Sequence, residues 1–462
     1  MNDVRDRSHR LNRATGIARH GRLRHRHPAG TAVKVLSGVA AVALVSSASV
    51  AAIAAKQVSD DLGDGVQIQG QSAPQARSAS NALSSYKGGF NMLVVGTDND
   101  PDQGTAYGER DATLNDVNIL LHVSADHSNA TAVSIPRDLV TPIPACRKAD
   151  GSGTTPAMAA QPINTAWGEG GLNCVVQTVQ GLTGLDVQYS AAVSFTGVIE
   201  MSNAIGGVPV CVAQPIHDRY TGLDLPQGTS TLQGDQALAF LRSRHGVGDG
   251  SDLGRISSQQ VFLSSLLRTV KSNDTLTSPT TLYKLARAAA SNMQLSQSLG
   301  DVGTMVQMGR ALQDLPLAQV NFVQYPGTTG GTGVYSGKVQ PTTELATQLF
   351  AKIKADQSFS LGADSTGIGS ERAAAGQSSG AGQSSGQADG QTAAGQAAAG
   401  QAASSAPAAG AGAPAAGAAS SPAAPAASAP ASSSTPASTP DTIDGLQGQS
   451  ADEQTCSKAF GS

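Results

Sequence analysis

The stretch from Asn115 to Pro144 constrains the fold most, because it places an acidic and a basic side chain at the same end of one hairpin. Its apolar runs Val117–Val123 and Ala130–Ile135 are rich in strand-forming residues and flank a turn-forming segment, which predicts two adjacent antiparallel strands. The chain enters the first strand at Asp116 and leaves the second at Arg137, so both side chains reach one rim of the sheet. A carboxylate and a guanidinium that converge there predict a site for a metal ion and an oxyanion.

A second carboxylate is expected at the same rim. Phe90–Gly96 has the pattern of a buried strand and opens into a polar loop that contains Asp98. If this strand lies antiparallel to Val117–Val123, Asp98 leaves it where Asp116 enters the sheet. Magnesium binds one or two carboxylates and completes its shell with water and phosphate oxygens, so Asp98 and Asp116 are candidate ligands for Mg2+ or Mn2+. In the structural alternative, Asp98 belongs to an Asx turn and Asp116 only begins a strand.

A glycine-rich stretch later in the chain carries three further arginines, Arg242, Arg244 and Arg255. Arginine suits bidentate phosphate recognition, and Arg255 lies near the N-terminus of an expected helix, whose dipole favours anions. Gln259 lies one turn further along the same helical face. Together with Arg137, these side chains predict a phosphate site.

Three features of the sequence have interpretations without a catalytic role. The arginines could form a solvated face paired with Asp249 and Asp252. His245 is expected to be a structural hydrogen-bonding residue, because no second residue of a catalytic triad is evident. Residues 376–380 match the GxSxG nucleophile pattern, but no strand precedes them and no helix follows, so they are rejected as a catalytic motif.

The N-terminal region indicates export. Residues 1–34 are rich in arginine, and residues 35–55 carry no charge and are long enough to cross a bilayer, which takes about 20 residues. We expect a basic cytoplasmic segment and a transmembrane helix, which make a single-pass protein of the cell membrane with everything after Lys56 outside. A cleaved signal peptide, with a cleavage site near Ala52–Ala54, and a basic nucleic-acid arm are the alternatives. The formal net charge of -4 argues against a nucleic-acid partner.

The remaining chain divides by composition. We expect a stalk over residues 56–88, one folded domain over 89–357, and a disordered low-complexity tail over 358–462, which is rich in Ala, Gly, Ser and Pro. The residues around Cys456 regain complexity, which leaves open that they dock back or pair with a domain cysteine.

Within the folded domain, helical and strand patterns alternate. This predicts the α/β class, with a mixed central β-sheet flanked by helices in an α-β-α arrangement. The expected helices are Leu172–Leu182, Thr196–Ile205, Gly234–Leu241 and Arg255–Lys271. The further expected strands are Val187–Phe195 and Val208–Val212.

The four cysteines agree with export, because their number is even and none forms a CxxC pair. Three pairings of Cys146, Cys174, Cys211 and Cys456 are possible. Cys146 with Cys174 is the first choice, because these two flank one loop.

At this point several ordered motifs resemble the LytR-CpsA-Psr family, in a form of actinobacterial type. The motifs are Asn91–Asp98, Asp116 opening a strand, Ser134–Asp138, Ile163–Ala166 with Gly170–Gly171, Arg242–His245, and Asp252–Arg255 with Gln259–Gln260. The resemblance is close from Phe90 to Lys271 and extends towards Gln357. It implies an extracytoplasmic phosphotransferase that moves an anionic glycopolymer from a polyprenyl-pyrophosphate carrier to peptidoglycan with a magnesium-type ion. Wall teichoic acid, arabinogalactan and capsular polysaccharide are substrates within the family.

Carried over position by position, the resemblance makes Asp98 and Asp116 the metal ligands and Arg137 and Asp116 the catalytic pair. The pyrophosphate would be held by the arginines already named, with Gln259 in support: Arg137, Arg242, Arg244 and Arg255. The polyprenyl tail would lie in an apolar pocket between sheet and helices, for which the candidates are Val193, Phe195 and Phe262. A pyrophosphate phosphatase and a lipid-binding regulator of the cell envelope without turnover are the alternative functions.

The chain departs from the family pattern at three places where the family usually has arginine. They are Asn99-Asp100, Leu114 and Ser258, and Arg110 is a candidate substitute for one of them. These departures would weaken phosphate binding or change the preferred acceptor.

Overall fold

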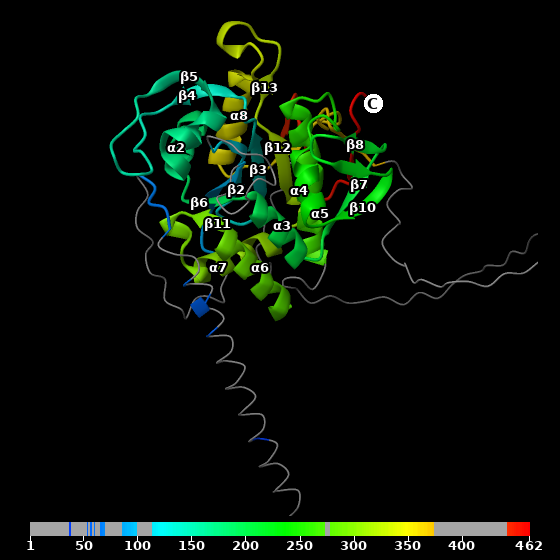
Figure 1. Ribbon diagram of the computed structural model, residues 1–462, viewed down its shortest axis with the longest axis horizontal. Helices are drawn as coiled ribbons and strands as arrows, with labels where there is room; N and C mark the ends of the chain where they lie inside the picture. The colour runs from blue at the N-terminus through cyan, green and yellow to red at the C-terminus, as the bar shows by residue number, and fades with distance from the viewer. Residues whose placement is uncertain are drawn as a thin grey trace, which may run out of the picture.

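A computed structural model describes residues 65–69, 86–98, 113–272, 278–373 and 441–462, with a few single positions before residue 65. Its centre is a seven-stranded sheet in the order β11-β6-β1-β2-β3-β12-β18 (Figure 1). These strands are β1 Phe90–Thr97, β2 Asn115–Val123, β3 Ala130–Ile135, β6 Tyr189–Val193, β11 Met293–Leu295, β12 Val320–Gln324 and β18 Gly448–Ser450. The pairs β1/β6 and β3/β12 are parallel and the others antiparallel, so the predicted mixed sheet is confirmed.

The hairpin predicted around Asp116 and Arg137 is also confirmed. Strand β2 pairs with β3 in antiparallel register, with Asn118 opposite Ile135. Strand β1 lies antiparallel on the other side of β2, with Gly96 opposite Val117. The end of β1, the start of β2 and the end of β3 therefore share one rim of the sheet.

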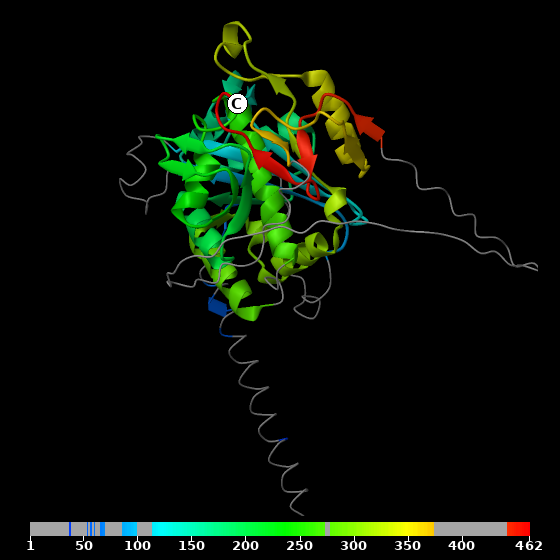
Figure 2. The same ribbon diagram turned by 90° about the vertical axis from the view of Figure 1, so that its right-hand side faces the viewer.

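Helices cover both faces of this sheet (Figures 1 and 2). Side chains alternate along β1, so that Leu93 and Val95 pack towards α2 and α8, whereas Phe90 and Met92 pack with α6 and α7. The helices are α2 Ala166–Thr183, α3 Phe195–Ala204, α4 Asp235–Arg242, α5 Asp252–Ser272, α6 Pro279–Asn292, α7 Val302–Asp314 and α8 Thr343–Lys354. The predicted α-β-α layering is confirmed.

A second sheet of four strands, in the order β10-β7-β19-β16, packs against α5. Its strands are β7 Val208–Val212, β10 Gly228–Leu232, β16 Ser370–Arg372 and β19 Thr455–Ser457. Two-stranded pairs complete the fold: β4 Val140–Ile143 with β5 Met158–Pro162, β8 Ile216–Asp218 with β9 Leu223–Leu225, β13 Gly327–Thr328 with β14 Gln340–Pro341, and β15 Phe359–Leu361 with β17 Asp441–Ile443. The short 3-10 helices are η2 Ile163–Thr165, η3 Gln297–Leu299, η4 Leu317–Gln319 and η5 Gly333–Tyr335.

The last 22 residues, 441–462, are part of this fold. Strand β18 adds to the edge of the main sheet beside β12, and β19 lies between β7 and β16. Figure 2 shows this segment in red across the domain, beside the segment 359–373. Ile443 and Leu446 are buried in the main core. The folded domain therefore extends past Gln357, the boundary expected from composition, while residues 374–440 lie outside the described part of the chain.

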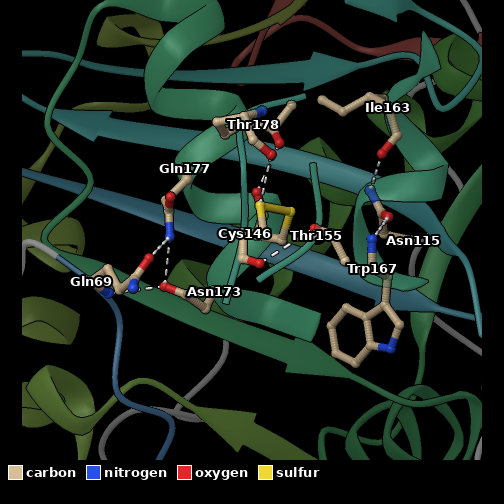
Figure 3. The surroundings of a disulfide bond; sticks show 11 residues. Gln69, Asn115, Cys146, Thr155, Ile163, Trp167, Asn173, Gln177 and Thr178 are labelled. Atoms are coloured by element: carbon tan, nitrogen blue, oxygen red, sulfur yellow. Dashed lines mark hydrogen bonds between the residues drawn. A yellow bond between two sulfur atoms is a disulfide. The ribbon is translucent and has the colours of Figure 1, made fainter. Parts of the chain in front are cut away.

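Both disulfides involve cysteines that the sequence singled out. Cys146 pairs with Cys174, as expected, and Cys211 pairs with Cys456. The first bond joins Cys146 to Cys174 in the middle of α2 (Figure 3). Gly170 and Gly171, one turn earlier, interrupt this helix. A Cβ on Gly170 would lie 2.6 Å from the carbonyl oxygen of Arg147, so a glycine is required where this loop crosses the helix.

The predicted cytoplasmic segment (1–34), the transmembrane helix (35–55) and most of the stalk (56–88) lie outside the described residues. Among the helices that the structure does describe, none is long and apolar enough to cross a membrane.

Candidate functional site

A polar cavity of about 290 Å3 lies at the rim where β1, β2 and β3 meet. It is lined by Asp116, Arg137, Asp218, Tyr220, Thr221, Arg242, Arg244, His245 and Arg255. Five of these were singled out from the sequence as an acid and four phosphate-binding arginines. The structure therefore brings together residues from the β2–β3 hairpin, the end of α4 and the first turn of α5.

Arg137 is held by three carboxylates. It follows β3 in a turn, in which the Leu139 N–H donates to the Pro136 carbonyl oxygen. Its Nη1 donates to Asp116 Oδ1 at 2.6 Å, its Nε lies 3.6 Å from Asp138 Oδ2, and its backbone N–H donates to Asp252 Oδ2 at 3.0 Å. Burial alone would lower the Arg137 pKa, but Asp116 and the neighbouring carboxylates outweigh it and raise that pKa. Arg137 therefore remains a fixed cation.

Arg255 joins the helix start to the hairpin. Its Nη2 donates to the Asp116 carbonyl oxygen at 2.8 Å and lies 2.6 Å from Asp252 Oδ1. Arg255 and Asp252 are only 4% and 3% exposed, and the first turn of α5 favours the negative charge of Asp252. The pairing with Asp252 that the structural alternative proposed is thus present, and it positions Arg255 at the cavity wall.

The arginines are not a bare positive cluster, because carboxylates alternate with them. Arg244 Nη2 lies 3.9 Å from Asp138 Oδ2, and Lys338 approaches the same carboxylate at 3.8 Å. Burial and then the like charge of Arg137 lower the pKa of Arg244. The Nε groups of Arg137, Arg244 and Arg255 are buried without a hydrogen-bond partner among the described residues. An anionic ligand with several oxygens would supply acceptors for the guanidinium groups that line the cavity.

Asp98 lies apart from the polar cavity. It is fully buried, its Oδ1 accepts from the Leu114 N–H at 2.8 Å, and its own N–H donates to the Leu114 carbonyl oxygen at 3.2 Å. It therefore ties together the two ends of the segment 99–112, which lies outside the described residues and contains Asn99-Asp100 and Arg110. Within the described part of the chain, no three His, Cys, Asp or Glu side chains group as a metal site.

Gln259 and Ser258 are neighbours on α5 that face different parts of the molecule. Gln259 Nε2 donates to the Leu241 carbonyl oxygen at 2.8 Å, and the residue does not line the polar cavity. Ser258 is fully buried and its hydroxyl contacts the Gly369 carbonyl oxygen and Ser457 Oγ. An arginine at position 258 would displace the C-terminal segment, which explains this departure from the family pattern.

A second, apolar cavity of about 430 Å3 adjoins the polar one. Its walls come from alternate residues of β1 and β2 and from the apolar stripe of α5, together with α3, α4 and α6. The predicted tail-pocket residues Val193, Phe195 and Phe262 all line it. Asp116, Arg242 and Arg255 line both cavities, and the Arg242 guanidinium lies 4.5 Å from the centre of the Phe195 ring. A charged cavity therefore lies directly beside a hydrocarbon-like one, with three side chains common to both walls.

Sequence reasoning missed the wall formed by the β8–β9 turn. Asp218 is 2% exposed; it accepts from Ser243 Oγ at 2.6 Å and from the Tyr220 N–H at 2.9 Å. Burial would raise the pKa of Asp218, but these and other hydrogen bonds lower it. The Tyr220 ring lies 4.5 Å from the ring of His245 at the cavity mouth. The only available signal was the Thr221-Gly222 turn between two short alternating runs.

Comparisons with known proteins agree with the motif pattern. The LytR_cpsA_psr family model matches residues 55–353. The cell wall biosynthesis protein LcpA of Corynebacterium glutamicum is 30% identical over 278 residues, which are 54% of this chain and 53% of LcpA. The polyisoprenyl-teichoic acid–peptidoglycan teichoic acid transferase TagT of Bacillus subtilis is 25% identical over 63% of this chain and 86% of its own.

A solved structure of protein gbs0355 from Streptococcus agalactiae matches 58% of this chain and 88% of its own with a TM-score of 0.48 and 20% identity. The chain spans about half the length of LcpA, with 53% of that protein aligned. Since the family model covers well over half of the 462 residues, the chain belongs to the LytR_cpsA_psr family.

Proposed function

We propose that this protein transfers an anionic glycopolymer, of the teichoic acid, arabinogalactan or capsule type, from a polyprenyl-pyrophosphate carrier to peptidoglycan. The observation that supports this most is the pair of adjoining cavities, one lined by arginines and one apolar, which share Asp116, Arg242 and Arg255. Together they match an amphiphile that carries a pyrophosphate on a long hydrocarbon tail. The names of TagT and LcpA, a teichoic acid transferase and a cell wall biosynthesis protein, agree with this substrate class.

In the proposed reaction, an acceptor hydroxyl of peptidoglycan attacks the phosphorus that bears the glycopolymer. A new P–O bond forms to the acceptor, the bond to the bridging oxygen breaks, and polyprenyl phosphate leaves. Arg137, Arg244 and Arg255 would bind the phosphate oxygens through donors already held in place by carboxylates, so little reorganisation is needed as charge develops. The hydroxyl proton is released to solvent as the new bond forms.

A divalent cation, Mg2+ or Mn2+, is the proposed cofactor. Asp116 suits this role because its carboxylate lines the cavity and only its Oδ1 is hydrogen-bonded to Arg137. Asp98, the other predicted ligand, is fully buried outside the cavity and its Oδ1 accepts from the Leu114 N–H, so the described residues offer one carboxylate with a free oxygen there. One carboxylate with water and substrate phosphate oxygens is a normal magnesium environment. The ion would neutralise charge on the pyrophosphate.

The proposed location is the outer face of the cell membrane, with the N-terminus in the cytoplasm and a single membrane pass at residues 35–55. The apolar cavity supports a membrane-bound lipid as one partner, and the excess of acidic residues agrees with the absence of a nucleic-acid partner.

The test supplies the full chain with a lipid-pyrophosphate-linked glycan, Mg2+ and peptidoglycan. Glycan attached to peptidoglycan supports the proposal, release of phosphate and free glycan alone would indicate a phosphatase, and binding without product would indicate a regulator. Arg137→Ala is expected to abolish transfer without loss of folding, whereas Arg147→Ala, an exposed arginine that does not line the cavity, retains it.

A further inference from the structure

The apolar cavity has a second end, far from the arginines. It follows α5 from Arg255 to Val270, which is about 22 Å at 1.5 Å per helical residue. At this far end the lining residues are Val270, Leu285 of α6 and Met293 of β11, and all three are half-buried. The cavity therefore reaches the protein surface beside α6.

Apolar surface continues from this opening onto the outside of the molecule. Leu282 lies one helical turn before Leu285 on the same side of α6 and is 38% exposed. On the neighbouring helix α7, Val306 is 43% exposed. Figures 1 and 2 both show α6 and α7 together at one end of the molecule, opposite β13.

Helix α6 is also basic. Lys284 and Arg287 are exposed on it, on the side turned away from Leu282 and Leu285, and the helix contains no acidic residue. A helix with apolar side chains on one side and lysine and arginine on the other is typical of helices that lie on an anionic lipid surface.

The chain also enters the domain here. The hydroxyl of Tyr283 on α6 donates to Gln57 Oε1 at 3.2 Å. Gln57 follows closely on residues 35–55, the uncharged segment that the sequence predicts to cross the membrane. An anchor at that position would bring α6 to the bilayer.

From these observations we propose that the α6–α7 end rests on an anionic phospholipid bilayer and that the apolar cavity opens there to the lipid. The exposed residues at this end are Leu282, Lys284, Arg287 and Val306. The proposal rests on the proposed function only for the identity of the lipid tail that enters the cavity. Its consequence is that the tail would enter from the membrane end while the pyrophosphate sits about 22 Å further along α5.

The experiment uses the full chain reconstituted into vesicles that contain anionic phospholipid. The native cysteines are all in disulfides, so a fluorophore can be attached selectively to Leu282→Cys. Val334→Cys is the matched control, because Val334 is an exposed apolar residue (60%) in η5, next to β13 at the opposite end. Nitroxide lipids labelled near the headgroup should quench the probe at position 282 several-fold more than the probe at 334.

Equal, weak quenching at both positions would overturn the proposal. Fluorescence changes at position 282 that appear in detergent and depend on protein concentration would also overturn it, because they would indicate contact with a second copy of the chain. Lys284→Gln with Arg287→Gln should reduce quenching at position 282 in anionic vesicles and leave it unchanged in neutral vesicles, because each lost charge weakens the attraction of α6 to anionic lipid by about fivefold. Quenching does not require turnover. A protein without transferase activity would still show strong quenching at position 282, whereas a protein that contacts the membrane through another surface would not.

Discussion

At the scale of single residues, the polar cavity is built from alternating charges. Arg137 is bonded to Asp116 and Arg255 to Asp252, so the guanidinium groups hold their positions without a ligand. The Asp116 and Arg137 positions could be predicted, because a strand pattern fixes where its ends lie. Asp218 could not, because it ends a strand of only three residues and its partner Ser243 lies 25 residues further along the chain.

Replacing Asp218 with asparagine should lower the stability of the protein, because Asp218 holds Ser243, which lies between Arg242 and Arg244. An amide has a single acceptor oxygen, so Asp218→Asn cannot accept both from Ser243 and from the Tyr220 backbone with the same strength. We expect a loss of about 1.5–3 kcal/mol in the free energy of unfolding, typical of a hydrogen bond to a buried charge. Denaturant unfolding measures this, with Ser243→Ala, which removes only one donor, as a milder control. Equal stabilities of Asp218→Asn and the native protein would contradict it.

His122 should make stability depend on pH. It is buried on β2, its Nδ1 lies 2.8 Å from Asn91 Oδ1, and its Nε2 lies 3.0 Å from Asp356. Burial lowers its pKa below the usual 6.5, although Asp356 opposes this. Because the unfolded chain then takes up a proton that the folded chain excludes, stability is full above about pH 6.5 and falls as the pH decreases.

Thermal unfolding between pH 8 and pH 5 tests this effect, and His122→Gln should flatten the decrease over that range. If the variant keeps the same slope, another group is responsible.

At the scale of elements, α5 unites the two chemistries of the site. It carries Arg255 in its first turn and Phe262, Leu266 and Val270 along the apolar cavity. Helical periodicity was enough to predict this helix. It could not reveal that the stripe lines a space rather than packing fully on the sheet, because that depends on how α3 and α6 approach from elsewhere in the chain.

Filling the apolar cavity should separate binding of the tail from binding of the headgroup. Leu266 lines the cavity, whereas the adjacent Leu267 packs against the core. Leu266→Trp should weaken binding of a polyprenyl-pyrophosphate donor by tenfold or more and leave the affinity for inorganic pyrophosphate unchanged. Leu267→Trp carries a similar overpacking cost of about 1–3 kcal/mol without filling the cavity. Competition binding with the two ligands distinguishes the two variants. If Leu266→Trp lowers the affinity for both ligands equally, the apolar cavity is not the pocket for the tail.

At the scale of the whole molecule, residues 441–462 hold α5 from outside. Gln449 Nε2 donates to Ser264 Oγ at 2.6 Å, and Arg268 Nη1 donates to the Ala451 carbonyl oxygen at 2.8 Å. Composition predicted the low-complexity region, but it could not locate strands of three residues whose partners are β7 and β12. Their pairing is decided by tertiary contacts and by the Cys211–Cys456 bond rather than by local pattern.

Truncation after Ala373 should be far more harmful than shortening the connection inside residues 374–440. The truncation removes β18 and β19, exposes the edges of β12 and β7, and breaks a disulfide worth about 2–5 kcal/mol. Deleting residues 385–430 removes none of the described residues and shortens the connection between β16 and β17, and the entropy of closing such a connection varies slowly with its length. Thermal unfolding and light scattering should show a destabilised, aggregating truncation and a nearly native deletion.

Because β19 lies between β7 and β16, the second sheet can be completed only after β19 has been synthesised. Strand β7 is made early and β19 only near the end, so the second sheet has a gap until Thr455–Ser457 emerge and insert. If the chain is exported N-terminus first, its earlier elements could pack outside the membrane while the second sheet still lacks β19. Chains that end before residue 448 would keep unpaired edges at β12 and β7. Proteases and chaperones could recognise such chains by these exposed strand edges.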